Sequence, residues 1–270
     1  MDLLEKIIAH KKIEVAKRKE MIPTKLLESS VYFSSPVVSM KKYLRRTDKL
    51  GIIAEIKRKS PSKGIINNYV NIERTSIGYM MAGASALSIL TDKEFFGGEN
   101  KDLTEARKYN YCPILRKEFI VDEYQIIEAK SIGADAILLL ANVLTKEEVK
   151  NFSEVANKLG LEVLLELYQE RELESVHESI DIVGINNRNL KNFEVNLDHS
   201  VSMLNKLPKE KIKIAESGIS SPEDLIALKK AGFDGFLIGE LFMKHSRPEE
   251  ACKNFITSVI TKLNTSSFVS

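Results

Sequence analysis

The chain has 270 residues, of which 43% are hydrophobic and 29% charged, and a formal net charge of +2. This composition supports a sizeable core, and the near-neutral charge argues against nucleic-acid binding through a broad basic surface. The two cysteines, Cys112 and Cys252, lack the spacing of a disulfide framework or a zinc site. No apolar run approaches the roughly 18 residues of a membrane span, and the first residues have no signal or transit-peptide pattern. We therefore expect a soluble, cytoplasmic protein without membrane contacts.

Residues 2–20 are predicted to form one amphipathic helix, because their apolar side chains fall near a single stripe. A basic helix of this kind can lie on a membrane, but the interspersed acids favour packing onto the chain's own domain. Pro23 ends the helix, and a further short helix is expected near residues 40–45. We assign residues 1–48 to an N-terminal helical extension rather than to a separate domain.

From Gly51 onward, short apolar runs rich in β-branched residues alternate with amphipathic helical stretches. The predicted strands are 51–56, 86–90, 113–116, 135–140, 162–166, 181–186, 212–216 and 234–238. Eight consecutive βα units favour an α/β fold of the closed (βα)8 TIM-barrel type over residues 49–262. The alternative, an open doubly wound sheet, would normally show a glycine-rich turn after its first strand, and none is present.

The junctions between these units carry local stop and start signals. A glycine follows four of the predicted helices and supplies the left-handed residue that turns the chain back into a strand: Gly83, Gly133, Gly160 and Gly232. Hydroxyl side chains followed by acids mark helix starts at Thr145 and Ser221. The polar residues 263–270 are expected to form a frayed C-terminal tail.

Ionisable residues gather at the predicted C-terminal ends of the strands, the face on which barrel enzymes place their active sites. Glu55 and Lys57 share one face of the first strand, because side chains alternate along a strand. Lys117 follows the third strand, and Glu166 ends the fifth. Burial and crowding would move their pKa values apart, so that one group could act as acid and another as base. A structural ion pair or solvated loop charges are the alternative interpretation.

Two further groups of residues suggest what the site binds. Ser217-Gly218 and Gly239-Glu240 follow the seventh and eighth strands, where barrels often bind a phosphate through backbone N–H groups, and Ser60 lies in the polar loop after the first strand. Apolar side chains on or beside the same face could line a pocket for an aromatic substrate or could belong to the core: Phe96, Phe119, Leu138 and Leu190.

Four motifs in this chain resemble the indole-3-glycerol-phosphate synthase family of tryptophan biosynthesis: 53–64, 115–120, 184–190 and 215–219. The resemblance runs from the N-terminal helix to about residue 260 and implies a (βα)8 barrel whose extra N-terminal segment packs over the active-site face. It also implies a carboxy-lyase that closes the pyrrole ring of 1-(2-carboxyphenylamino)-1-deoxyribulose 5-phosphate with release of carbon dioxide and water. No metal or organic cofactor is implied.

The resemblance also implies catalytic roles for named residues. Lys117 would be the general acid that protonates the ribulose carbonyl oxygen, and Glu166 would act as base or acid in the later proton transfers. Glu55 would orient the lysines or share that duty. Lys57 would hold the substrate carboxylate or act as a second proton donor, and the sequence does not decide which lysine serves which step.

Binding roles are implied in the same way. Asn186 and Arg188 would grip polar groups of the substrate. The backbone around Ser217, Gly218, Gly239 and Glu240, with Ser60 nearby, would hold the phosphate. The anthranilate ring would be sandwiched by Phe96, Phe119, Leu138, Leu190 and Ile238.

Three positions depart from the family pattern. Lys59 stands where a small residue is usual, and Glu118 where aspartate is commoner. Glu240 stands where a serine hydroxyl often meets the phosphate. Since a carboxylate would repel that group, we expect only the Glu240 backbone N–H to contribute, with the side chain turned away.

Two rival functions are considered. A phosphoribosylanthranilate isomerase-like barrel would need a Cys/Asp-type acid–base pair at strand ends, whereas Cys112 precedes its strand. A non-catalytic barrel, which could dock through its basic N-terminal helix onto other tryptophan-pathway enzymes, would be expected to lose Lys117 or Glu166, and neither is lost.

Overall fold

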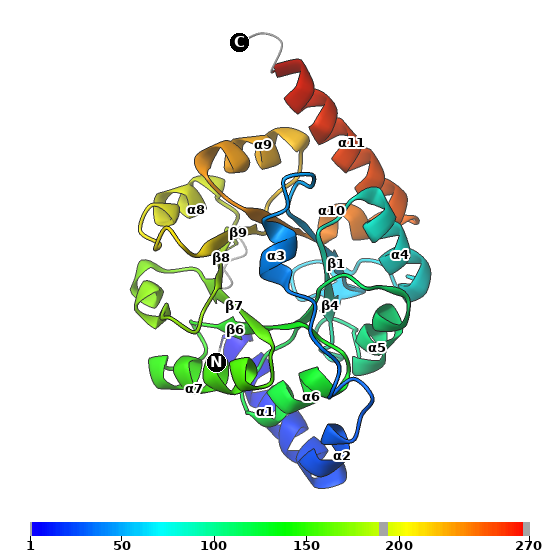
Figure 1. The fold of residues 1–270 in the computed structure, drawn as a ribbon, viewed down its shortest axis with the longest axis vertical. Coiled ribbons are helices and arrows are strands. Elements are labelled where there is room, and N and C mark those ends of the chain that lie inside the picture. Colours follow the sequence, from blue (N-terminus) through cyan, green and yellow to red (C-terminus); the bar gives the residue numbers. More distant parts are fainter. Residues whose placement is uncertain (1, 189–193, 267–270) are drawn as a thin grey trace.

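Eight parallel strands form a closed barrel in a computed structural model that describes residues 2–188 and 194–266. Around the ring the strands follow the order β1-β10-β9-β8-β7-β6-β5-β4, and helices surround them (Figure 1). The strands are β1 (Ile52–Ile56), β4 (Ala86–Leu90), β5 (Ile114–Lys117), β6 (Ala136–Leu140), β7 (Glu162–Leu167), β8 (Ile182–Asn186), β9 (Ile212–Glu216) and β10 (Gly235–Ile238). The predicted TIM barrel is confirmed, and each predicted strand agrees to within one residue at either end.

The strands are buried on both faces, which explains their nearly continuous apolar sequence. One set of side chains fills the barrel interior, with Ile53, Leu115 and Leu164 among its fully buried members. The other set packs outward against the surrounding helices and forms a larger apolar cluster. The core therefore has the two layers expected of a closed barrel, and it fixes the strand ends on which the polar residues lie.

The predicted stop and start signals lie at or next to ends of the outer helices. They are α4 (Ile72–Ala82), α5 (Asn100–Tyr109), α6 (Tyr124–Ser131), α7 (Lys146–Lys158), the 3-10 helix η1 (Glu170–Ser175), α8 (Leu197–Leu204), α9 (Pro222–Ala231), α10 (Glu240–Met243) and α11 (Pro248–Ser266). The four predicted stop glycines all have positive φ angles. Thr145 and Ser221 both cap their helices in capping boxes, so these start signals are confirmed.

The N-terminal extension covers both ends of the barrel. Helix α1 (Leu3–Met21) contributes Leu3, Leu4 and Ile7 to the pocket at the C-terminal strand ends, while α2 (Thr24–Glu28) lies against α6. Helix α3 (Met40–Leu44) crosses the middle of the strand ring at the opposite end (Figure 1). There it packs its buried side chains into the barrel interior. The expected packing over the active-site face thus holds for α1, whereas α3 closes the other end.

Two local predictions differ from the structure. The polar loop after β1 contains a short antiparallel hairpin, β2 (Lys59–Ser60) with β3 (Gly64–Ile65). The frayed tail predicted for 263–270 is wrong over its first part, because α11 continues to Ser266. Residues 267–270 lie outside the described part of the chain. Among the described residues, no helix is long and apolar enough to cross a membrane.

Candidate active site

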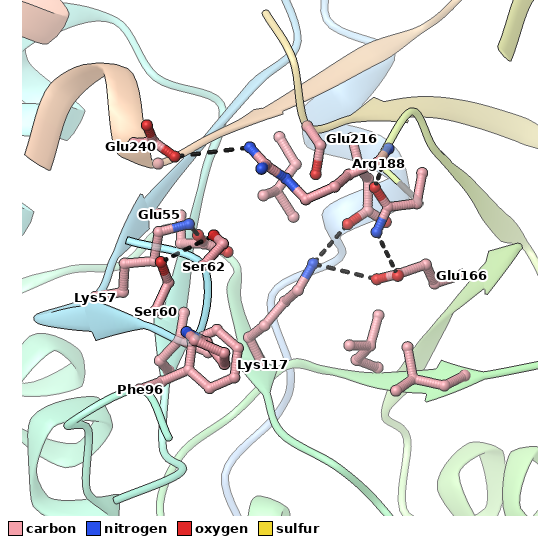
Figure 2. Close-up of a pocket in the computed structure, with 18 of the residues that line it drawn as sticks. Glu55, Lys57, Ser60, Ser62, Phe96, Lys117, Glu166, Arg188, Glu216 and Glu240 are labelled. Atoms are coloured by element: carbon pink, nitrogen blue, oxygen red, sulfur yellow. Dashed lines mark hydrogen bonds and ion pairs between the residues drawn. The ribbon is translucent and has the colours of Figure 1, made fainter. Parts of the chain in front are cut away.

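A pocket opens at the C-terminal ends of the barrel strands (Figure 2), and Leu3, Leu4 and Ile7 of helix α1 line it. Every predicted site residue that the structure describes lines this pocket, and only Leu190 lies outside the described residues. The catalytic and polar members are Glu55, Lys57, Ser60, Lys117, Glu166, Asn186, Arg188, Ser217, Gly218, Gly239 and Glu240, and the apolar members are Phe96, Phe119, Leu138 and Ile238. Closing the barrel has therefore gathered residues from all along the sequence at one rim.

Lys117 stands at the end of β5 and reaches across the barrel mouth (Figure 2). Its Nζ lies 2.5 Å from Oε2 of Glu216, at the end of β9, and 3.4 Å from Oε2 of Glu166 on β7. The other oxygen of Glu166 accepts a hydrogen bond of 2.7 Å from Nδ2 of Asn186. A single ammonium group is thus held between two carboxylates, and one of these is fixed by an amide.

A second acid–base pair lies at the end of β1. The Nζ of Lys57 donates to Oε1 of Glu55 at 2.7 Å, and Glu55 is only 3% exposed. Across the strand pair, a Cβ at Gly239 would overlap the Glu55 carboxylate. Glycine is therefore required at the end of β10, because any larger residue would displace this acid.

The charges at the barrel mouth are unequal, with three carboxylates facing two lysines: Glu55, Glu166 and Glu216 with Lys57 and Lys117. Burial opposes ionisation of Lys117, but the neighbouring carboxylates outweigh this and raise its pKa above the usual value. Burial also disfavours ionised Glu55, yet the two lysines lower its pKa. Burial raises the pKa of Glu216 to about 8, and the adjacent glutamates add to this effect. Glu216 is therefore the one of the three glutamates that keeps a proton near neutral pH.

Two short backbone segments that line the pocket follow β9 and β10. Ser217 is the one non-glycine residue with a positive φ among the described residues, at 64°, and Gly218 follows with a φ of 80°. Gly239 precedes helix α10, whose first N–H groups have no acceptor within the helix. The two segments lie side by side, because β9 pairs with β10.

Glu240 differs from its expected orientation. Its carboxylate does not turn away from the site but lies 3.6 Å from the Arg188 guanidinium across the pocket mouth (Figure 2). The ammonium group of Lys63 is 3.8 Å from the same side chain. Glu240 therefore lies beside two cations, those of Arg188 and Lys63.

The opposite wall of the pocket is apolar. The rings of Phe96 and Phe119 lie 5.9 Å apart between centroids at an angle of 41°. Leu138 continues this wall, and Ile7 of α1 closes it from above. A flat aromatic group fits such a lining, since the rings and branched side chains exclude water from its faces.

Two features of the site were not predicted from the sequence. Glu216 was placed at a strand end but given no catalytic role, although it occupies the same kind of position on β9 as Glu166 does on β7. That parallel is the signal that could have found it. The second is the set of bonds that Asn186 makes within the protein: its Nδ2 donates to Glu166, and its Oδ1 accepts the Arg188 backbone N–H. Its predicted contact with the substrate stays a prediction.

Comparison with known proteins agrees with this geometry. Residues 4–255 match the family model described as indole-3-glycerol phosphate synthase. A protein of that name from Bacteroides thetaiotaomicron is 46% identical over 258 residues, which cover 96% of this chain and 99% of that protein. The chain belongs to the indole-3-glycerol phosphate synthase family.

A second indole-3-glycerol phosphate synthase, from Caldanaerobacter subterraneus, is 42% identical over 95% of this chain and 98% of its own length. Members of the family are carboxy-lyases of tryptophan biosynthesis, and this chain has that activity. The resemblance that the four motifs predicted is therefore confirmed over nearly the whole sequence.

Solved structures agree with the fold alone. The tryptophan synthase α subunit from Legionella pneumophila has a TM-score of 0.61 at 14% identity and covers 84% of this chain. A chain of the tryptophan synthase complex from Pyrococcus furiosus has a TM-score of 0.59 at 15% identity. At such low identity, these similarities establish a shared TIM barrel and carry no argument about the chemistry.

Proposed function

We propose that the pocket binds 1-(2-carboxyphenylamino)-1-deoxyribulose 5-phosphate and that Lys117 is the general acid of its ring closure. The observation that carries this proposal is the Lys117 ammonium, held between Glu216 and Glu166 with an apolar wall beside it. A protonated lysine at that point can neutralise negative charge as it develops on an oxygen in a water-poor site.

In the first step, the ring carbon that bears the carboxylate attacks the ribulose carbonyl carbon. The carbon–oxygen double bond opens, and the oxygen takes a proton from Lys117. The raised pKa of Lys117 keeps it protonated before the reaction. Proton transfer from Lys117 becomes favourable only as the carbonyl oxygen gains negative charge. Lys117 therefore acts in the transition state rather than in the resting enzyme.

Carbon dioxide then leaves the ring carbon, and the electrons of the broken bond restore the aromatic ring. The new hydroxyl departs as water after receiving a proton, and a base removes a proton from the neighbouring methylene carbon to complete the pyrrole. We assign the proton for the leaving hydroxyl to Lys57, whose ammonium group is oriented by the hydrogen bond that it donates to the Glu55 carboxylate. Glu166 is the base, with its orientation fixed by Asn186.

The phosphate is assigned to the backbone around Ser217, Gly218 and Gly239, with Ser60 and Arg188 at its edge. The aromatic ring is assigned to the wall formed by Phe96 and Phe119 on the opposite side. Binding at two remote ends positions the reacting carbons between the acid–base pairs, and this positioning can supply much of the rate enhancement.

The isomerase alternative is weaker in this structure. Cys112 is buried before β5, at the end of the barrel away from the pocket. The non-catalytic alternative is also weaker, because the four acid–base residues are retained and in contact. A cytoplasmic location, and association with other tryptophan-pathway enzymes, remain proposals that rest on the biosynthetic role of the family.

The direct test follows indole fluorescence after the purified protein is mixed with the carboxyphenylamino-deoxyribulose phosphate. We expect stoichiometric formation of indole-3-glycerol phosphate and carbon dioxide without added metal or cofactor. Phosphoribosyl anthranilate, offered separately, should remain unchanged. Isomerisation of that compound without indole formation would instead support the rival function.

A further inference from the structure

Helix α1 carries a lysine that is buried against the loops after β4 and β5. Lys11 is 1% exposed, although lysine almost always keeps its charge in water. Its Nζ lies 2.9 Å from Glu14, 2.9 Å from Asp92 and 3.0 Å from Glu118. Burying an ammonium group costs free energy unless carboxylates surround it. The three carboxylates at these distances therefore form a buried ion cluster that compensates the charge of Lys11.

The partners of Lys11 belong to two loops that form the pocket. Asp92 follows β4, and its Oδ1 accepts the backbone N–H groups of Phe95 at 2.7 Å and Phe96 at 3.1 Å. These bonds fix the turn that presents the Phe96 ring to the pocket. Since the other oxygen of Asp92 meets Lys11, α1 is joined to this aromatic wall through a single carboxylate.

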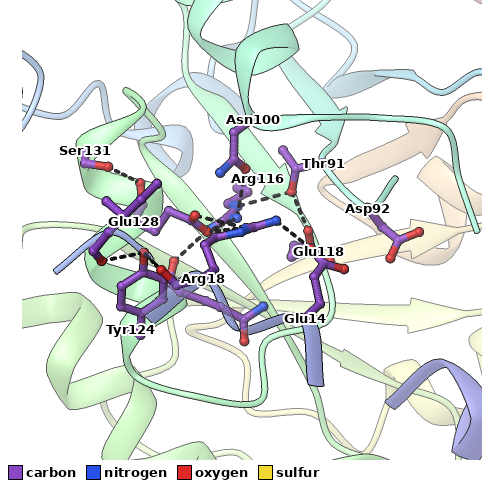
Figure 3. Close-up of polar contacts among 12 residues, drawn as sticks. Glu14, Arg18, Thr91, Asp92, Asn100, Arg116, Glu118, Tyr124, Glu128 and Ser131 are labelled. Carbon is purple, nitrogen blue, oxygen red and sulfur yellow. Dashed lines mark hydrogen bonds and ion pairs between the residues drawn. The ribbon is translucent and has the colours of Figure 1, made fainter. Parts of the chain in front are cut away.

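Glu118 is the residue directly after Lys117. Its Oε2 accepts a hydrogen bond of 2.8 Å from the Thr91 hydroxyl (Figure 3). Its Oε1 accepts the Phe119 backbone N–H at 2.9 Å. The same Oε1 is 3.0 Å from Lys11. Lys11 therefore reaches the chain segment that carries both the general acid and the second aromatic ring.

The residue before Lys117 is tied to the same helix. Arg116 is fully buried and contacts Glu128 at 2.5 Å. Glu128 in turn lies 2.9 Å from Arg18 of α1, which is 2.5 Å from Glu14 (Figure 3). Both sequence neighbours of Lys117 are thus connected by ionic contacts to one face of α1.

We propose that Lys11 is a positioning residue of the active site. It holds α1, whose Ile7 lies one turn earlier and lines the pocket, against the loops that carry Phe96 and Phe119. Its ionic partners belong to α1 and to the loops after β4 and β5. The proposed phosphate end is built from β9 and β10, so the effect of Lys11 is on the anthranilate end of the pocket. This inference rests on the proposed placement of the aromatic ring against that wall.

A purely structural role would predict a different pattern. Buried ionic groups can often be replaced by apolar side chains without loss of stability, so stability alone does not require a lysine here. What an apolar replacement cannot do is fix two carboxylates from separate loops in one orientation. Loss of Lys11 should therefore loosen one wall of the pocket and leave the opposite wall in place.

The test compares Lys11→Met with Lys17→Met, which removes an exposed lysine from the same helix. Lys11→Met should raise KM roughly 10- to 100-fold, with a smaller effect on kcat, because misplaced binding groups cost about this much. Competitive inhibition by free anthranilate should weaken in parallel, whereas inhibition by inorganic phosphate should keep its constant. Lys17→Met should match the unsubstituted protein in all four quantities.

Two results would overturn the proposal: unchanged KM and anthranilate inhibition in Lys11→Met, or equal weakening of anthranilate and phosphate binding. If Lys11→Met does not fold, Asp92→Asn removes one partner of the lysine while keeping the shape, and the same selective loss is expected. Lys117→Ala distinguishes an error in the proposed function from an error in the role of Lys11. An active Lys117→Ala protein would contradict the proposed function, whereas an inactive one beside an unaffected Lys11→Met protein would contradict only the role of Lys11.

Discussion

Replacement of Glu216 by glutamine removes a carboxyl group that can bind a proton at the barrel mouth, while keeping the shape of the side chain. Glu216 is 1% exposed and lies 2.5 Å from the Lys117 ammonium. Burial raises its pKa to about 8, the nearby Glu166 and Glu55 carboxylates add to this, and Lys117 offsets part of it. The folded chain should therefore hold a proton on Glu216 at neutral pH that the unfolded chain does not hold.

The effect on stability follows from the two pKa values. The unfolded carboxyl titrates near 4.5 and the folded one near 8, so the contribution of Glu216 is complete below pH 4.5 and is lost as the pH rises through 8. At pH 6 the folded pKa is two units higher than the pH. At 1.36 kcal/mol per unit, the free energy of unfolding should fall by about 3 kcal/mol between pH 6 and pH 9.

Urea unfolding of the unsubstituted protein and Glu216→Gln at pH 6 and pH 9 measures this difference. All other titrating groups are shared, so the unsubstituted protein should lose about 3 kcal/mol more than the variant across this range. In thermal unfolding, this would correspond to an extra fall in Tm of roughly 6–10 °C. Equal losses in the two proteins would show that Glu216 is ionised at neutral pH and would refute the charge arrangement.

Three further predictions concern the pocket. Glu166→Gln should lower kcat about 10²- to 10⁴-fold in the fluorescence assay, because it removes the proposed base; a loss below tenfold would argue against that role. Gly239→Ala should raise KM and lower Tm, since its Cβ would overlap the Glu55 carboxylate, and unchanged values would contradict the tight packing at this point. Glu240→Gln should strengthen inhibition by inorganic phosphate roughly two- to tenfold by removing a negative charge beside the anion; weaker inhibition would place the phosphate elsewhere.

The barrel could be predicted from the sequence because each βα unit specifies its own limits. Gly83 and Gly232 end their helices through their own left-handed backbone conformation. Thr145 and Ser221 cap their helices by accepting backbone N–H groups of the first turn. Lys117 and Glu166 could be predicted as site residues for a similar reason. A short stretch of sequence is enough to show that each stands at the end of a strand.

The remaining features depend on contacts between distant segments. Lys11 looked like one more basic residue of a surface helix, because the carboxylates of Asp92 and Glu118 that bury it lie far along the chain. Glu216 was visible in the sequence only as the last residue of a predicted strand. Its contact with Lys117 exists only when the closed ring sets β9 across from β5. The plug formed by α3 was missed because its apolar residues are few and their partners are spread over the whole barrel.

The role of Lys117 is tested most directly by single-turnover fluorescence of Lys117→Ala beside Lys93→Ala, which removes an exposed lysine from the loop after β4. The Lys117 variant should form indole-3-glycerol phosphate about 10²- to 10⁴-fold more slowly, with its affinity for inorganic phosphate retained. The Lys93 variant should react at the unsubstituted rate. A Lys117→Ala protein that closes the ring as fast as Lys93→Ala would contradict the assignment of the general acid.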